Sequence, residues 1–141
     1  MLDRIRRERG SGSEFLDFKT GSGGMIEAEF LVQALQMREN IREPNWTRVV
    51  DYLRKCSQFT ESEMINLKRA YEFLRRCESV LRRYENTSVS ALPADPSEQC
   101  KVSRRLGFET FETFAQEYRA ARSSIHEIYN RRITSPATRS G

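Results

Sequence analysis

The sequence has no long apolar run, few helix breakers and no cluster of cysteine or histidine, and each absence excludes a class of protein. A helix that crosses a bilayer needs about 20 consecutive apolar residues, and no apolar run in this sequence comes near that length. The first nine residues, MLDRIRRER, lack the apolar centre of a signal peptide. Cys56, Cys77 and Cys100 are widely spaced, and His126 is the only histidine. We therefore expect no disulfide scaffold, no metal site, no membrane partner and a cytoplasmic location.

Helix-breaking residues are scarce outside one short segment. The 141 residues include four prolines and seven glycines, and five of the glycines lie between residues 10 and 24. The rest of the chain is therefore typical of long helices. Eight Phe, five Tyr and one Trp provide enough apolar surface for the core of one domain.

The positive charge lies at the two ends of the chain. Of the net charge of +4, residues 1–9 contribute +2, residues 130–141 contribute +3, and the segment between them carries −1. A nucleic-acid-binding domain needs its basic residues concentrated on a folded face, so the charge map argues against such a partner. Glu72 and Glu78 are spaced to neutralise Arg76 and Arg82 on one helix, which favours a solvated surface there.

Five helices are predicted, because apolar side chains recur every three or four residues between recognisable start signals. They are expected at residues 25–38, after Asn45, at about 61–86, after Asp95 and at about 110–132. Asn45 and Asp95 are typical N-caps, and Thr60 with Glu63 forms a capping box. Gly107 is placed to end the fourth helix.

The core candidates follow from the same periodicity. The first helix is expected to be buried on most of its circumference through Ile26, Phe30, Leu31, Ala34, Leu35 and Met37. The long helix contributes Ile65, Leu67, Tyr71, Leu74, Leu81 and Tyr84, and the last helix contributes Phe111, Phe114, Tyr118, Ala121, Ile125 and Tyr129. The fold class is therefore an all-α bundle of four to five helices over residues 25–133. Residues 1–24 are expected to form a helix stub, one strand and a glycine-rich turn, and residues 134–141 are expected to form a flexible tail.

The N-terminal segment indicates a missing neighbour. Residues 1–9 look like the last turns of a helix, and residues 15–19 (FLDFK) alternate like one strand. A lone strand has no ladder partner, so we expect its sheet elsewhere and the chain to have been cut from a longer one.

The glycine turn at residues 20–24 precedes a helix, where backbone N–H groups can bind phosphate. It matches neither a Walker A loop nor a dinucleotide fingerprint, so a structural turn is preferred and phosphate contact stays open. Glu29 lies in an apolar stretch and is expected to form a buried salt bridge with an arginine. His126 has no serine or cysteine constellation for catalysis, and we expect it to be a surface or partly buried helix residue.

Three blocks of sequence resemble the glutamine synthetase adenylyltransferase family. They are DFKTGSGGMIEAEFLVQALQ at residues 17–36, LKRAYEFLRRCE at residues 67–78, and LPADP at 92–96 followed by RLGF at 105–108. Their order and spacing fit essentially the whole chain. Ala28 departs from the pattern, which usually has a larger aliphatic residue there.

The resemblance implies a helical domain that follows the nucleotidyltransferase domain of a bacterial enzyme of nitrogen metabolism. That enzyme transfers AMP from ATP to a tyrosine of glutamine synthetase and removes it by phosphorolysis. The family's chemistry needs a GxxD…DxD carboxylate signature with Mg²⁺, and the present sequence has no such motif. We therefore expect no catalytic residue, no metal site and no activity in this chain alone, with ATP and Mg²⁺ bound by the parent enzyme.

The resemblance also gives site and partner expectations. Asp17 and the turn would face the active site, with Lys19, Gly21, Gly23 and Gly24 contacting nucleotide or the catalytic domain. The expected partners are the catalytic nucleotidyltransferase domain, glutamine synthetase and a PII-type signalling protein. The alternatives are a free-standing helical interaction module and the helical domain of a related PII uridylyltransferase.

Overall fold

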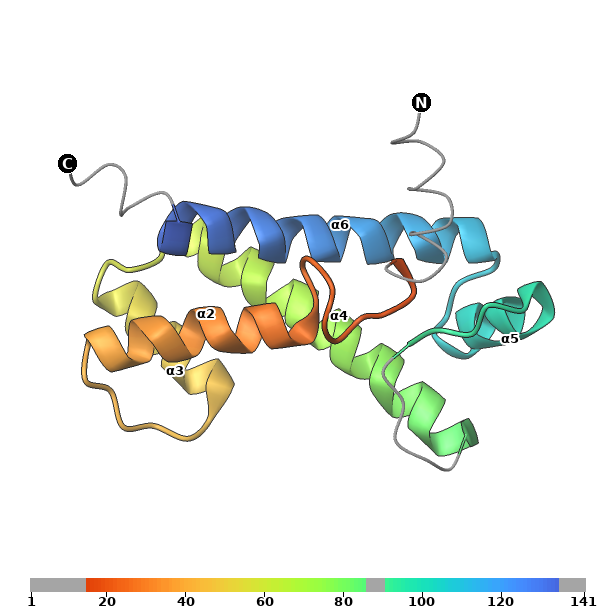
Figure 1. The fold of residues 1–141 in the computed structure, drawn as a ribbon, viewed down its shortest axis with the longest axis horizontal. Helices are drawn as coiled ribbons and strands as arrows, with labels where there is room; N and C mark the ends of the chain where they lie inside the picture. Colours follow the sequence, from red (N-terminus) through yellow and green to blue (C-terminus); the bar gives the residue numbers. More distant parts are fainter. Residues whose placement is uncertain (1–14, 86–90, 135–141) are drawn as a thin grey trace.

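Three helices pack around one long helical pair. The computed structural model describes residues 15–85 and 91–134, with the backbone alone at Tyr84, Glu85 and Thr134. The helices are α2 (Met25–Arg38), α3 (Trp46–Lys55), α4 (Glu61–Glu85), α5 (Pro96–Arg105) and α6 (Phe111–Tyr129), and a π-helical turn, η2 (Asn130–Thr134), continues α6. The pair is formed by α4 and α6, α2 contacts both of them, and α3 and α5 lie near opposite ends (Figure 1). The all-α fold class is confirmed.

Local sequence signals set the helix ends as predicted. The side chains of Asn45 and Asp95 each accept the backbone N–H three residues further on, at 3.0 and 3.1 Å. Pro96 occupies the first turn of α5, where its missing N–H leaves no hydrogen bond unmade. Gly107 follows α5 with φ at +97°, a conformation that glycine adopts without strain.

The core lies between α4 and α6, with α2 closing one side. Its largest fully buried side chains are Tyr118, Phe18, Phe114, Leu31, Leu35, Leu53, Leu67, Leu74 and Ile125. The rings of Phe73, Phe108 and Phe114 pack within 5.6–6.1 Å of one another. The aromatic residues at the start of α6 therefore form core and do not offer a stacking platform for bases.

We expect Leu74→Ala to lower the free energy of unfolding by about 2–5 kcal/mol, because it opens a cavity in a closely packed core. Leu74 is fully buried in α4. Urea denaturation measures the change, and Ile65→Ala, at an exposed position of the same helix, serves as the control. A loss below about 1 kcal/mol is what an average substitution causes and would remove Leu74 from the core.

The strand predicted at residues 15–19 is wrong. The described residues there form one isolated antiparallel bridge, between Asp17 and Ala91, and the N–H of Leu92 donates to the carbonyl of Leu16 at 2.8 Å. The strand fails because the Asp17 side chain captures backbone N–H groups that would otherwise extend a ladder. The bridge partner lies in this chain, before α5. The helix end predicted at residues 1–9 lies outside the described residues, as does the tail predicted at 134–141 except for Thr134, which belongs to η2.

Helix α2 is buried on one side only, which corrects a second prediction. Its buried residues are Met25, Ala28, Leu31, Val32 and Leu35, whereas Ile26, Phe30 and Met37 are exposed. Ile65 of α4, another predicted core residue, is also exposed. Periodicity identifies apolar faces, but it does not say which of two faces packs inside the domain.

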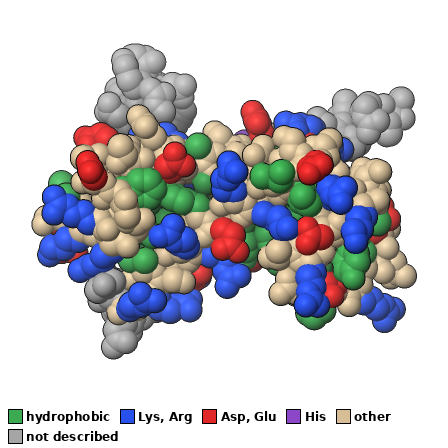
Figure 2. All heavy atoms as spheres, turned by 180° about the vertical axis from the view of Figure 1, so that it is seen from behind, with side chains coloured by type: hydrophobic (Ala, Val, Ile, Leu, Met, Phe, Trp, Pro, Cys, Tyr) green, Lys and Arg blue, Asp and Glu red, His purple; other side chains and the backbone are tan. Residues whose placement is uncertain are grey.

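Charges of both signs are mixed over the surface. Figure 2 shows Lys and Arg side chains interspersed with acidic ones across the face behind that of Figure 1. The predicted pair of Glu78 with Arg82 forms at 2.9 Å, whereas Arg76 donates to the carbonyl of Leu106 at 3.3 Å. This face therefore offers no continuous basic patch of the kind that binds nucleic acid.

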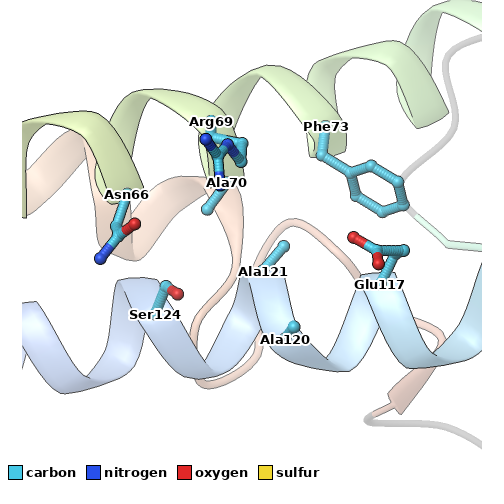
Figure 3. A pocket seen from close by; sticks show the side chains of 8 residues that line it. All are labelled: Asn66, Arg69, Ala70, Phe73, Glu117, Ala120, Ala121 and Ser124. Atoms are coloured by element: carbon cyan, nitrogen blue, oxygen red, sulfur yellow. The ribbon is translucent and has the colours of Figure 1, made fainter.

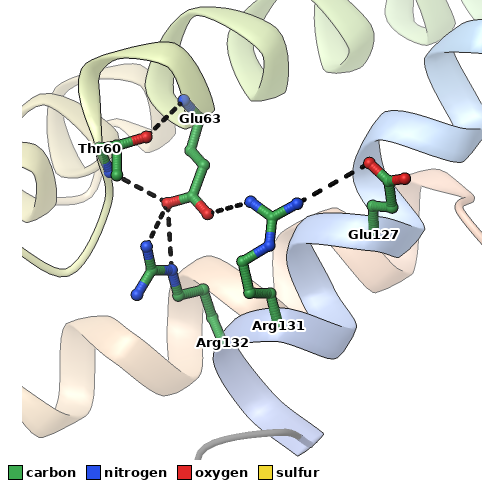
Figure 4. Close-up of polar contacts among 5 residues, drawn as sticks. All are labelled: Thr60, Glu63, Glu127, Arg131 and Arg132. Carbon is green, nitrogen blue, oxygen red and sulfur yellow. Dashed lines mark hydrogen bonds and ion pairs between the residues drawn. The ribbon is translucent and has the colours of Figure 1, made fainter.

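A buried acid, Glu63, binds two arginines of the basic segment that follows α6. One carboxylate oxygen of Glu63 accepts two N–H groups of Arg132, at 2.6 and 3.1 Å, and the other accepts an N–H of Arg131 (Figure 4). The same carboxylate completes the predicted capping box, with the Thr60 N–H donating to it at 3.0 Å. The sequence predicts the capping box of Thr60 and Glu63. It does not predict the contact with Arg131 and Arg132, which come from η2 near the other end of the chain.

We expect acid to loosen this cluster. Burial raises the pKa of Glu63, but hydrogen bonds from Arg132, Thr60 and Arg131 outweigh burial and hold the pKa below its ordinary 4.5. Because the folded-state pKa lies below the unfolded one, the charged carboxylate stabilises the fold at neutral pH, and this contribution is lost as the pH falls from 4.5 through the folded-state pKa. Unfolding midpoints measured from about pH 7 to pH 3 should fall more steeply for the native chain than for Glu63→Gln. Equal slopes would contradict the prediction, and Glu61→Gln, at an exposed acid of the same turn, is the control.

Candidate functional site

Asp17 organises the segment that leads into α2. Its carboxylate accepts the backbone N–H groups of Lys19 and Thr20, at 3.0 Å each, and the Thr20 hydroxyl at 2.6 Å. Burial raises the pKa of Asp17, but these hydrogen bonds and the charge of Arg122 outweigh burial and hold the pKa below its ordinary 3.8. At neutral pH Asp17 is therefore a carboxylate that fixes a turn and has no proton to donate.

A buried arginine attaches residues 15–24, called the strap below, to α6. Arg122 Nη1 donates to the carbonyls of Phe15 and Asp17 at 2.8 Å each, and its Nε and Nη2 donate to the carbonyl of Ser22 at 3.1 and 2.9 Å. Nη1 also lies 2.8 Å from the hydroxyl of Tyr118, which itself donates to the Phe15 carbonyl. A guanidinium can be buried here because several acceptors surround its fixed fork of donors.

Gly23 lies against α6 where no side chain fits. Its φ is +73°, and a Cβ built on it would lie 2.1 Å from the backbone oxygen of Arg122. Real atoms do not approach this closely, so the glycine is required both by its backbone conformation and by the contact. Arg122 thus holds the strap through its side chain and its backbone together.

The amides of the glycine turn bind acceptors of the chain itself. The N–H groups of Gly23, Gly24, Met25 and Ile26 donate at 2.6–2.9 Å to Glu27 or to carbonyls of the strap. The Glu27 carboxylate therefore places negative charge at the helix N-terminus, where a phosphate would otherwise bind. The contact of Gly21, Gly23 and Gly24 with nucleotide or another domain stays a prediction.

Lys19 is directed towards α4. Its Nζ lies 3.0 Å from Glu78 Oε2, the same oxygen that pairs with Arg82. Lys19 therefore helps to neutralise Glu78 within the bundle. A contact with nucleotide or the catalytic domain requires Lys19 to leave this acid, and that role also stays a prediction.

A shallow hollow lies beside the turn. It is lined by Thr20, Gly21, Ser22, Ile26, Glu27, Phe30 and Tyr129. Nearby, His126 Nδ1 lies 3.2 Å from both Ser22 Oγ and Glu27 Oε1. A Ser–His–acid triad uses different ring nitrogens for the serine and the acid, so this arrangement is not a nucleophilic centre. The hollow suits binding, with polar and apolar side chains side by side.

Glu29 does not form the predicted buried salt bridge. It is exposed and accepts a hydrogen bond from the hydroxyl of Tyr71 at 2.5 Å. Burial of Tyr71 and the charge of Glu29 both raise the pKa of that hydroxyl. Glu29 contacts the Tyr71 hydroxyl and not an arginine because α2 directs Glu29 towards α4 at the edge of the bundle.

A second groove runs between α4 and α6. Figure 3 shows Asn66, Arg69 and Phe73 on one helix facing Glu117 and Ser124 on the other, and short alanine side chains complete the lining. The groove combines one acid and one base, which is too little to assign a reaction or a ligand.

The described residues offer neither a metal cluster nor a membrane span. Within residues 15–85 and 91–134, no three His, Cys, Asp or Glu side chains come together to hold a metal ion. No helix of that part of the chain is long and apolar enough to cross a membrane.

Sequence reasoning missed Arg122, the residue that places the strap. A signal was present, because Arg122 lies four residues after Tyr118 and three before Ile125, within the buried face of the last helix. A charged residue on such a face requires acceptors. Its acceptors are backbone carbonyls about 100 residues earlier, which sequence spacing does not reveal.

Comparison with known proteins places the chain beside large bacterial enzymes. A family model described as GlnD PII-uridylyltransferase matches residues 1–133. Similar curated proteins are bifunctional glutamine synthetase adenylyltransferase/adenylyl-removing enzymes. The one from Methylococcus capsulatus is 28% identical over 141 residues (96% of this chain and 14% of the relative), and the one from Bordetella pertussis is 35% identical over 111 residues (74% and 12%). The relative from Alteromonas mediterranea is 29% identical over 131 residues (89% and 13%). The chain thus spans between 12% and 14% of the length of these relatives.

Proposed function

Because the chain belongs to the GlnD PII-uridylyltransferase family, and curated relatives are bifunctional glutamine synthetase adenylyltransferases, we propose that it is a helical domain of such an enzyme. In this role it performs no transfer itself. It docks the catalytic nucleotidyltransferase domain or glutamine synthetase, or it relays a signal from a PII-type protein. ATP and Mg²⁺ are bound by the catalytic domain.

The fixed strap is the observation that carries this proposal. The segment that resembles the family is attached to α6 by Arg122 and Gly23, while Thr20 and Ser22 stay exposed on it. A rigid turn that presents polar side chains to solvent is suited to docking another protein surface. Regulation through the same surface would act by changing how another domain or protein sits on it.

The described residues do not suit Mg²⁺-bound ATP. Lys19 pairs with Glu78, the turn amides donate within the chain, and the Asp17 carboxylate is occupied by Lys19 and Thr20. No step of AMP transfer is therefore assigned to them, and we propose a contact with a protein domain in preference to a nucleotide.

A binding assay with purified partners tests the proposal. The chain is immobilised and exposed separately to glutamine synthetase, a PII protein and the nucleotidyltransferase domain of a relative. Binding of glutamine synthetase or of the nucleotidyltransferase domain is expected. Binding of PII alone fits the relay role, and binding of none of the three favours a free-standing module and contradicts the proposal. AMP found on glutamine synthetase after incubation with this chain, ATP and Mg²⁺ alone would also overturn it.

We expect Asp17→Ala and Lys19→Ala to leave the bundle folded but to reduce adenylyl transfer when the chain is part of a full-length enzyme. The Lys19–Glu78 pair is partly exposed, and such pairs contribute about 1 kcal/mol or less. Circular dichroism checks the fold, and labelled AMP on glutamine synthetase measures transfer. Arg82→Ala removes the other ion pair of Glu78 and is the control. Unchanged turnover in both strap variants would refute a functional role for the strap.

A further inference from the structure

A row of exposed apolar side chains runs along the solvent side of α2. Ile26, Phe30 and Met37 are 50%, 52% and 79% exposed. Together with Gln33 they occupy positions i, i+4, i+7 and i+11, the spacing of a coiled-coil seam. This row, called the α2 seam below, lies on the face opposite to the buried residues Ala28, Leu31 and Leu35.

The spacing between the residues of the α2 seam is the same from either end of the helix. Its spacings are four, three and four residues, so a second α2 lying antiparallel can match it position by position. Ile26 of one copy then lies opposite Met37 of the other, and Phe30 lies opposite Gln33. A two-fold interface between identical copies uses the same residues on both sides. The residues of one α2 must therefore pair with those of a second α2 that runs in the opposite direction.

The charges of α2 follow the same symmetry. Glu27 lies in its first turn, and Arg38 lies in its last turn. An antiparallel arrangement places Glu27 of each copy near Arg38 of the other, and it also opposes the two helix dipoles favourably. The Phe30 ring, already 6.3 Å from the ring of Tyr129, is supported from one side and free on the other.

We infer that the α2 seam is a homodimer interface, in which the α2 helices of two copies of this chain pack antiparallel about a two-fold axis. Ile26, Phe30 and Met37 form its apolar centre. This inference goes beyond the proposed function and does not rest on it.

Sedimentation equilibrium of the full chain tests the inference. The native chain should form a dimer, and Phe30→Glu should raise the dimer dissociation constant by about tenfold or more, because it places a charge at the centre of the interface. Ile65→Glu changes an exposed apolar residue on α4 and should leave the dimer unchanged. A native chain that stays monomeric at about 100 μM, where even weak specific pairs form, would overturn the inference. So would a dimer that Ile65→Glu disrupts and Phe30→Glu does not.

Disulfide trapping tests the orientation. In a Cys56→Ser, Cys100→Ser background, a mixture of Ile26→Cys and Met37→Cys chains should cross-link on oxidation, whereas neither chain alone should. Eleven residues of helix separate the two positions by about 16 Å, which is beyond the reach of a disulfide. Cross-linking of Ile26→Cys chains with one another would show a parallel pair and overturn the inference. Neither experiment involves glutamine synthetase or PII, so the inference and the proposed function fail separately.

Discussion

Arg122→Met is expected to lower the free energy of unfolding by about 2–6 kcal/mol, since it leaves the partly buried carbonyls of Asp17 and Ser22 without their Arg122 donors, at about 1–3 kcal/mol each, and leaves the Phe15 carbonyl with the Tyr118 hydroxyl alone. The affected acceptors are the carbonyls of Phe15, Asp17 and Ser22. Methionine fills much of the space of the arginine stem but donates no hydrogen bond. Urea denaturation followed by circular dichroism measures the loss.

Two variants separate the hydrogen bonds of Arg122 from its charge and position. Arg122→Lys keeps the charge but not the planar fork, so it should lose most of the same free energy. Arg119→Met is the control on the same helix, because Arg119 is exposed and lies 4.9 Å above the Phe15 ring. Its loss should stay near 1 kcal/mol, as for an exposed cation–π contact. A loss of similar size in Arg119→Met and Arg122→Met would contradict the role assigned to Arg122.

Gly23→Ala is expected to lower the free energy of unfolding by about 3–5 kcal/mol. A left-handed backbone costs alanine about 1–2 kcal/mol, and the added Cβ would lie 2.1 Å from the backbone oxygen of Arg122. Because that oxygen belongs to a helix and cannot move aside, the strap must shift and lose hydrogen bonds to Arg122. Thermal and urea unfolding measure the change.

Gly107→Ala is the matched control. Gly107 also has a positive φ, +97°, but a Cβ there would meet nothing within 4 Å. Gly107→Ala should therefore lower the free energy of unfolding only by the cost of a left-handed backbone, about 1–2 kcal/mol. Equal losses at the two glycines would show that the contact with α6 adds nothing. The double variant Gly23→Ala, Arg122→Met should lose less than the sum of the two, because both changes release the same segment.

Helix positions were predictable because their signals are local. Asn45, Thr60 with Glu63, and Asp95 before Pro96 bind backbone groups within four residues, so the sequence contains both partners of each contact. The prediction of a strand at residues 15–19 was wrong because another local contact forms there. The Asp17 side chain makes a turn that the alternating pattern does not reveal.

The candidate site was only partly predictable. The glycine turn and its family resemblance identify the segment, but its neighbours come from distant parts of the chain. Arg122, Glu78 and His126 lie between 59 and 107 residues from their strap partners. Spacing rules describe one helix at a time and do not place one helix against another.

The amino-acid sequence by itself determined the helices, their caps, the all-α class and the family resemblance, because each depends on short-range hydrogen bonds, periodicity or motif order. Only the tertiary structure decided that Arg122 and Gly23 fix the strap, that Glu63 holds Arg131 and Arg132, and that Ile26, Phe30 and Met37 face solvent. These outcomes depend on which faces of distant helices meet, and burial is a property of that packing rather than of any single residue.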